Sequence, residues 1–197
     1  DSEYVFRNSA RGSDFERVIV EYLLDQGYTK FASMADNSAY GQGLCEYERA
    51  ALEKAGLELV VETYAGDDKD FTGQLTRILQ DDPEVILLAG SEVAAGLIAK
   101  QARALGFEGV LAGGCAIGTP KFIEVAGDAA EGAYFSSVYI SPAGDSIVED
   151  WAKRYEEKWG EPPEGHGAKA YDGAMLLIEA MEQAYPDITG ERIAEEF

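Results

Sequence analysis

Two hydrophobic periods alternate along residues 4–140 of the chain. Short apolar runs, which indicate buried strands, occur at residues 31–34, 57–64, 84–89, 110–112 and 133–140. Between these runs, apolar residues recur every three to four positions, which indicates helices that bury one face. A strict alternation of strand and helix predicts an α/β fold. We expect a Rossmann-like, doubly wound parallel sheet of about five strands with right-handed crossovers.

The run at residues 84–89 is the strongest strand signal, because four consecutive apolar residues begin at Val85. Such a run is typical of a strand that is buried on both faces, as in a parallel sheet. The helix that follows this strand is expected to turn five residues inward: Val93, Leu97, Ile98, Ala102 and Leu105.

Helix ends carry their own signals. Asn37 or Ser38 can cap the helix after the first strand, and Asp70 is expected to cap the next helix. Gly27 and Gly56 follow two helix ends, as glycine commonly does.

The pattern changes after the fifth strand. Residues 145–159 and 168–184 have the periodicity of two helices, and a third begins at residue 188. No strand is predicted in this tail, which indicates that the chain is part of a longer protein. We expect one unit at residues 1–141 and a helical segment at residues 142–197.

Both tail helices have strong apolar faces. Their apolar residues are Ile147, Val148, Trp151 and Tyr155 on the first helix, and Ala170, Ala174, Leu177, Ile178 and Met181 on the second. Monomers rarely expose patches of this size. We therefore expect the tail either to fold back on the preceding unit or to associate with a second copy as a homodimer.

The charge balance excludes two classes of partner. Sixteen Lys and Arg residues stand against 37 Asp and Glu residues, which gives a net charge of −21 over 197 residues. Nucleic acids and anionic membranes are bound through Lys and Arg, so neither is expected as a partner. No apolar run is long enough to span a bilayer. The chain begins at Asp1 rather than Met, so we expect that an N-terminal part was removed.

Catalytic motifs are missing from the sequence. His166 is the single histidine, and it follows a Pro-rich loop without a serine elbow or a phosphate-binding loop elsewhere in the chain. Two cysteines and one histidine are too few for a structural zinc site. A disulfide between Cys45 and Cys115 is not indicated. We expect no catalysis, no metal and no cofactor.

Three small or polar turns follow predicted strands, at residues 36–43, 90–92 and 113–118. The carboxyl ends of parallel strands meet at one sheet edge, where ligands bind in open α/β folds. Each turn can offer backbone amides, a hydroxyl group or an aromatic ring. Together they predict a site for a small ligand.

Several segments occur in an order typical of one family. They are YVFR at residues 4–7, DNSAYGQG at 36–43, AG at 55–56, DF at 70–71, QARALG at 101–106, AGDAAEG at 126–132 and AYDGA at 170–174. In this order the chain resembles the periplasmic ligand-binding proteins of branched-chain amino acid ABC transporters, which have the type I periplasmic binding fold.

The resemblance implies a two-lobed protein that closes on its ligand, of which this chain holds the second lobe and part of the return into the first. It implies a periplasmic or extracellular importer component, either secreted or lipid-anchored, that delivers its ligand to a membrane permease. The ligand would be a branched-chain amino acid or a related small carboxylate or amide. A ligand-sensing domain of a membrane receptor is the alternative, since such receptors reuse this fold.

The resemblance also implies the site residues. Tyr40 matches the aromatic residue that covers the ligand, and Ser91 or Glu92 matches the wall after the third strand. Cys115 falls where amino-acid-binding members carry an acidic residue that pairs with the ligand ammonium. That departure leaves two alternatives: either Glu92 supplies the charge, or the ligand lacks an amino group.

Two further positions complete the predicted ligand-binding set. Ala116 adjoins Cys115 in the same turn. His166, or its neighbour Gly167, lies near the point where members of the family close the site from the hinge side.

Overall fold

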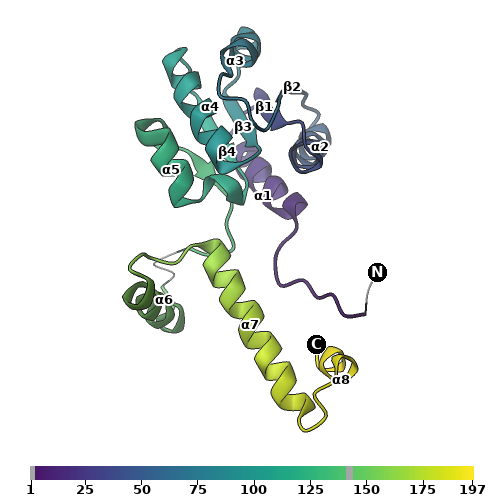
Figure 1. The fold of residues 1–197 in the computed structure, drawn as a ribbon. Coiled ribbons are helices and arrows are strands. Elements are labelled where there is room, and N and C mark those ends of the chain that lie inside the picture. Colours follow the sequence, from purple (N-terminus) through teal and green to yellow (C-terminus); the bar gives the residue numbers. More distant parts are fainter. Residues whose placement is uncertain (1–2, 141–143) are drawn as a thin grey trace. The chain divides into compact units, whose positions relative to one another are not determined.

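The computed structural model describes residues 3–140 and 144–197, and these divide into two units (Figure 1). The sheet unit is Arg11–Ser137, and the helical unit combines Asp1–Ala10 with Val138–Phe197. The expected boundary between residues 141 and 142 lies outside the described residues.

The sheet unit is a five-stranded parallel sheet with helices on both faces. The strands are β1 (Phe31–Asp36), β2 (Leu59–Tyr64), β3 (Val85–Ala89), β4 (Val110–Gly113) and β5 (Tyr134–Phe135). The helices are α1 (Gly12–Asp25), α2 (Ala39–Lys54), α3 (Thr72–Ile78), α4 (Glu92–Ala104) and α5 (Pro120–Ala126). The strand order is β2-β1-β3-β4-β5, and every neighbouring pair is parallel. The prediction of a doubly wound parallel fold is confirmed.

Each face of the sheet has its own apolar core. On one face, α1 and α2 pack Ile19, Leu23 and Leu52 with Val85 and Leu87 of β3. On the other face, residues of α3, α4 and α5 pack with Ile86 and Leu88. The alternate residues of β3 thus enter different cores, which is why its sequence is apolar without interruption.

The fifth strand is much shorter than predicted. Residues 133–140 were expected to form it, but β5 contains only Tyr134 and Phe135, and both side chains are exposed. This edge strand pairs only with the last two residues of β4. The strand β5 ends at Phe135 because its partner β4 ends at Gly113 and offers no further backbone for pairing.

Two details of the helices also differ. Leu105 was expected to point inward, but it is 41% exposed because α4 ends at Ala104 and Leu105 forms its C-cap. In α3, the N-cap is Phe71 instead of Asp70, although the Asp70 carboxylate accepts a 3.0 Å hydrogen bond from the Thr72 amide.

The helical unit contains α6 (Ser146–Trp159), α7 (Gly165–Ala184) and α8 (Gly190–Glu195). The helix α7 starts three residues earlier than predicted because the Glu164 carboxylate accepts hydrogen bonds from the amides of His166 and Gly167. Trp151 of α6 is buried, and its ring lies 5.4–5.6 Å from the rings of Tyr139, Tyr155 and Tyr171.

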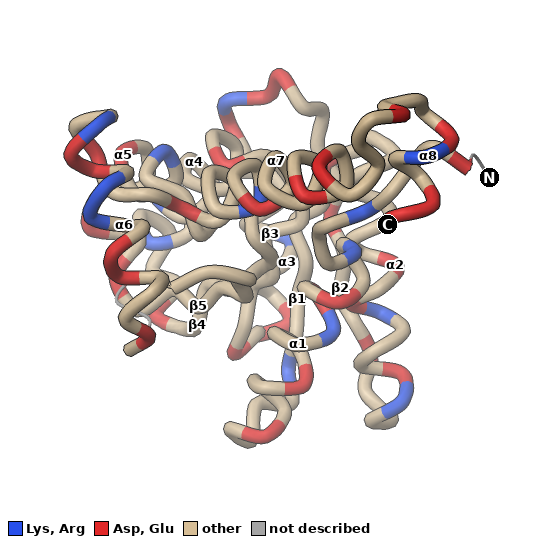
Figure 2. The backbone as a smooth tube through the Cα atoms, turned by 90° about the horizontal axis from the view of Figure 1, so that it is seen from below, with Lys and Arg blue, Asp and Glu red and all other residues tan. Residues whose placement is uncertain are grey.

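Acidic residues are spread over the helices of both units, with Lys and Arg interspersed among them (Figure 2). Over the described residues, this interspersed distribution is typical of a solvated surface. Over the part of the chain that the structure describes, no helix has both the length and the apolarity to cross a membrane.

Candidate functional site

Three turns of the sheet unit lie next to one another at the carboxyl edge of the sheet. They follow β1, β3 and β4, which are neighbours in the sheet. The chain reverses its strand order between β1 and β3, because β2 lies on one side of this pair and β4 on the other. Crevices at such a reversal point are the usual ligand sites of open α/β sheets.

Asp36 lies between the turn after β1 and the turn after β3. This last residue of β1 is buried, and its Oδ1 atom accepts a 2.8 Å hydrogen bond from the Ser38 amide. Ser38 in turn caps α2 by accepting from the Gly41 amide at 3.2 Å, as predicted. A Cβ atom at Gly90, in the turn after β3, would lie 3.2 Å from Asp36 Oδ2. The Asp36 carboxylate therefore lies between the two turns.

This packing predicts opposite effects for two glycines of α2. A Cβ atom at Gly41 would lie 2.5 Å from the backbone oxygen of Asp36, whereas a Cβ atom at Gly43 would meet nothing within 4 Å. Gly41→Ala should lower the free energy of unfolding by about 1–3 kcal/mol, since rigid backbone must move. Gly43→Ala, the matched control, should raise it by about 0.5–1 kcal/mol. Urea unfolding measures both, and equal effects would contradict the described packing.

Tyr40 projects from the first turn of α2 and is 51% exposed. Partial burial, and then the nearby Cys115, Glu16 and Asp36, raise the pKa of its phenol to about 12. Tyr40 is therefore neutral at physiological pH. It offers a ligand an aromatic face and a hydroxyl group that can donate or accept a hydrogen bond.

The turns after β3 and β4 are connected through Glu92. This residue is half-buried, and its Oε2 atom accepts a 2.7 Å hydrogen bond from the Thr119 hydroxyl group. Thr119 also caps α5, so Glu92 links the start of α4 to the start of α5. Ser91 caps α4 by accepting from the Ala94 amide at 3.4 Å. Glu92 thus places a carboxylate at the sheet edge.

Cys115 and Ala116 lie in the short 3₁₀ segment after β4 (η2, Cys115–Ile117), and both are half-buried. Cys45 and Cys115 are both thiols and do not form a disulfide. Among the described residues, no group of three or more His, Cys, Asp or Glu side chains is arranged to hold a metal ion.

Five of the six predicted site residues therefore share one edge of the sheet unit. They are Tyr40, Ser91, Glu92, Cys115 and Ala116. The sixth, His166, belongs to α7 of the helical unit, where it is exposed and its Nδ1 atom lies 2.7 Å from Glu164 Oε2. The role of all six in ligand binding stays a prediction.

Two buried carboxyl groups near this edge were missed by the sequence reasoning. Glu16 of α1 and Glu48 of α2 are both completely buried. A signal was present, since Glu16 occurs among the apolar positions 15, 19, 20 and 23 and Glu48 lies midway between Leu44 and Leu52. An acidic residue within an apolar stripe predicts a buried carboxyl group.

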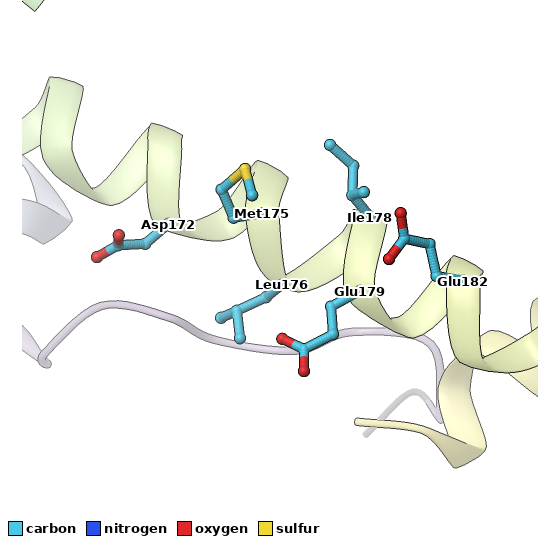
Figure 3. A pocket seen from close by; sticks show the side chains of 6 residues that line it. All are labelled: Asp172, Met175, Leu176, Ile178, Glu179 and Glu182. Carbon is cyan, nitrogen blue, oxygen red and sulfur yellow. The ribbon is translucent and has the colours of Figure 1, made fainter. Parts of the chain in front are cut away.

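The helical unit has a hollow of about 630 Å³ along α7 (Figure 3). All the residues that line it come from this one helix: Asp172, Met175, Leu176, Ile178, Glu179 and Glu182. A ligand site usually has convergent polar groups from several elements. This hollow is the flank of a helix and does not compete with the sheet edge as a site.

Comparison with known proteins identifies the family of this chain. Residues 1–197 match the periplasmic binding protein family over their whole length. The chain belongs to this family. Proteins of the family bind solutes and are not enzymes.

The similar proteins include Leu/Ile/Val-binding protein homolog 3 of Brucella melitensis, which is 28% identical, with 92% of this chain and 50% of the relative covered. A leucine-binding protein of Thermotoga maritima has a TM-score of 0.90 at 26% identity, with 98% of this chain and 56% of that chain covered. A branched-chain amino acid transporter protein of Thermus thermophilus with bound valine has a TM-score of 0.84 at 25% identity, with 98% and 53% covered. The chain spans about half the length of the curated relatives it matches.

Proposed function

We propose that this chain is the second ligand-binding lobe, with part of the return into the first lobe, of the solute-binding component of an ABC importer. Residues 1–141 would form the lobe and residues 142–197 the return segment. The observation that carries the proposal is the open sheet edge on which Tyr40, Glu92 and Cys115 lie. Relatives of about twice the length supply enough additional chain for a second lobe to cover this edge.

The ligand is proposed to be a branched-chain amino acid or a related small carboxylate or amide. Relatives named as Leu/Ile/Val-binding proteins and the valine-bound neighbour support this class. A ligand ammonium needs a partner charge when it is buried, because an unpaired one costs several kcal/mol. Cys115 does not provide that charge, whereas the half-buried carboxylate of Glu92 does.

Calorimetric titration of the complete two-lobed protein tests the proposal. Leucine, isoleucine and valine should bind, and the 2-oxo acids of the same carbon skeletons should bind more weakly. If only the oxo acids or amides bind, the ligand lacks an ammonium group and the role of Glu92 is wrong. If native mass spectrometry of ligand-free preparations and titration both detect no small ligand, the function itself is refuted.

Tyr40→Ala in the two-lobed protein should weaken ligand binding by about 1–3 kcal/mol, because the variant loses a buried aromatic contact. Tyr47→Ala is the matched control, since Tyr47 is another exposed aromatic residue of the same helix. Its dissociation constant should equal that of the wild type. Equal weakening in both variants would show that α2, rather than the Tyr40 ring, matters.

The importer role implies a membrane permease as partner and a periplasmic or extracellular location. A ligand-sensing domain of a membrane receptor is the second candidate. It is favoured by the likeness to an extracellular ligand-binding receptor of Rhodopseudomonas palustris, at 27% identity and a TM-score of 0.79. A kinase or transmembrane segment in the same gene would decide for the receptor, and a neighbouring permease gene would decide for the importer.

A further inference from the structure

Glu16 and Glu48 form an unusual pair in the core between α1, α2 and the sheet. Both side chains are 0% exposed, and none of their four carboxyl oxygens has a hydrogen-bond donor of ordinary geometry among the described residues. Burying one ionised carboxylate without a partner costs several kcal/mol, and two adjacent ones cost more. A proton held between the two groups removes one charge and provides a hydrogen bond.

The protonation of this pair is supported by its electrostatics. Burial, and then the neighbouring carboxyl group of Glu48, raises the pKa of Glu16, whereas the nearby Gly114 amide opposes this shift. Burial likewise raises the pKa of Glu48, and the nearby Ser33 and Glu16 side chains oppose it. The pair therefore titrates as one unit, well above the ordinary range of a glutamate.

Glu16 also lies against the backbone of the candidate site. A Cβ atom at Gly114 would lie 2.4 Å from Glu16 Oε1, so the carboxyl group lies directly against this backbone. Gly114 is the N-cap of the 3₁₀ segment that begins at Cys115. Tyr40 is close enough for the charge of Glu16 to act on its phenol. A change of charge on Glu16 thus acts on two positions of the sheet edge.

We propose that the Glu16–Glu48 pair is a proton-holding support that positions the Gly114–Cys115 turn, so that the geometry of this turn changes when the pair loses its proton. Glu16 is a positioning residue and does not contact the ligand. The consequence for ligand capture rests on the proposed function, whereas the support of the turn does not.

Other titratable and charged groups face this region from each packed element. They are Cys45, Arg49 and Tyr40 from α2, Asp36 from β1 and Cys115 from the turn after β4. Arg49 acts on the thiol of Cys45, whose pKa it lowers against the effect of burial. No cationic side chain among the described residues forms an ion pair with Glu16 or Glu48, so a proton is left to reduce the charge of the pair.

The test uses Cys115 as a reporter and requires no ligand. Alkylation of Cys115 by iodoacetamide is followed by peptide mass spectrometry from pH 6 to pH 9.5. In the wild type, the rate should show a second inflection besides that of the thiol itself, with an amplitude of about threefold or more. The variants Glu16→Gln and Glu16→Gln/Glu48→Gln should lack it. Glu46→Gln, at an exposed position of α2, the helix that carries Glu48, should keep the second inflection.

A single inflection in the wild type, or a second one that persists in the double variant, would overturn the proposal. If the variants do not fold, an NMR titration of the carboxyl and amide resonances of the wild type tests the proposal instead. Two glutamate carboxyl groups should then titrate above the ordinary range, and the Gly114 amide shift should follow them. Ordinary titration of all glutamates would also overturn the proposal. Neither outcome depends on whether the two-lobed protein binds an amino acid.

Discussion

Replacing Glu16 with Gln should raise the free energy of unfolding at pH 8 by about 1–3 kcal/mol, since each pKa unit corresponds to about 1.4 kcal/mol. The buried pair must hold a proton in the folded state, because burial raises the pKa of both carboxyl groups. In the unfolded chain the same groups ionise in the ordinary range near 4.5. The amide of Gln keeps the shape and donates a hydrogen bond to Glu48 without a charge.

The direction with pH follows from the same shift. A carboxyl group whose pKa is raised in the folded state is protonated in both states below its ordinary pKa, so it does not destabilise the fold there. As the pH rises from the ordinary pKa to the raised pKa, the group ionises in the unfolded chain but stays protonated in the fold, and the free energy of unfolding falls. The wild type should therefore lose stability between about pH 5 and pH 9, and Glu16→Gln should lose less. Urea unfolding at pH 5 and pH 8 measures the difference. Glu46→Gln is the control, and parallel pH curves for all three proteins would contradict the buried-proton account.

The sheet could be predicted from the sequence because its central strands β1 and β3 are buried on both faces. Every residue of β1 and β3 is buried, and the uninterrupted apolar run of β3 was the clearest signal, whereas Ser33 interrupts the apolar residues of β1. The run at residues 133–140 had a similar composition, but β4 is only four residues long, so β5 pairs with two of them. Strand length at a sheet edge depends on the partner, and the sequence of one strand does not contain that information.

The site was predictable to the level of its turns. Strand ends and caps located the turns that bear Tyr40, Ser91 and Cys115, because parallel strands bring their carboxyl ends to one edge. The contacts beneath these turns were not predictable. Asp36 lies against Gly90 and Glu16 lies against Gly114, and these glycines belong to turns that only the folded chain brings close to β1 and α1. Periodicity shows which side of a helix is buried, but not which backbone a buried carboxyl group meets.

We expect the exposed apolar face of α7 to decide whether this chain by itself is a monomer or associates. Four consecutive residues leave much of their surface in water: Met175 at 46%, Leu176 at 45%, Leu177 at 44% and Ile178 at 47%. Of these, Leu177 and Ile178 lie on one apolar face, whereas Leu176 points to the opposite side of the helix. Met181 and Tyr185 extend the face toward the end of the helix. Burying a large apolar side chain contributes about 1.5–3 kcal/mol, so an uncovered face of this size favours association.

We expect the 197-residue chain by itself to associate through this face. Size-exclusion chromatography with light scattering should give a mass above the 21.3 kDa of one chain. Leu177→Glu/Ile178→Glu should restore the monomer, because carboxylates do not tolerate burial at an apolar interface. Ile123→Glu is the control, since Ile123 is a single exposed apolar residue of α5 and should not affect the mass. A wild-type mass of one chain at all concentrations would show that α7 tolerates exposure, and the expectation of a homodimer would then be wrong.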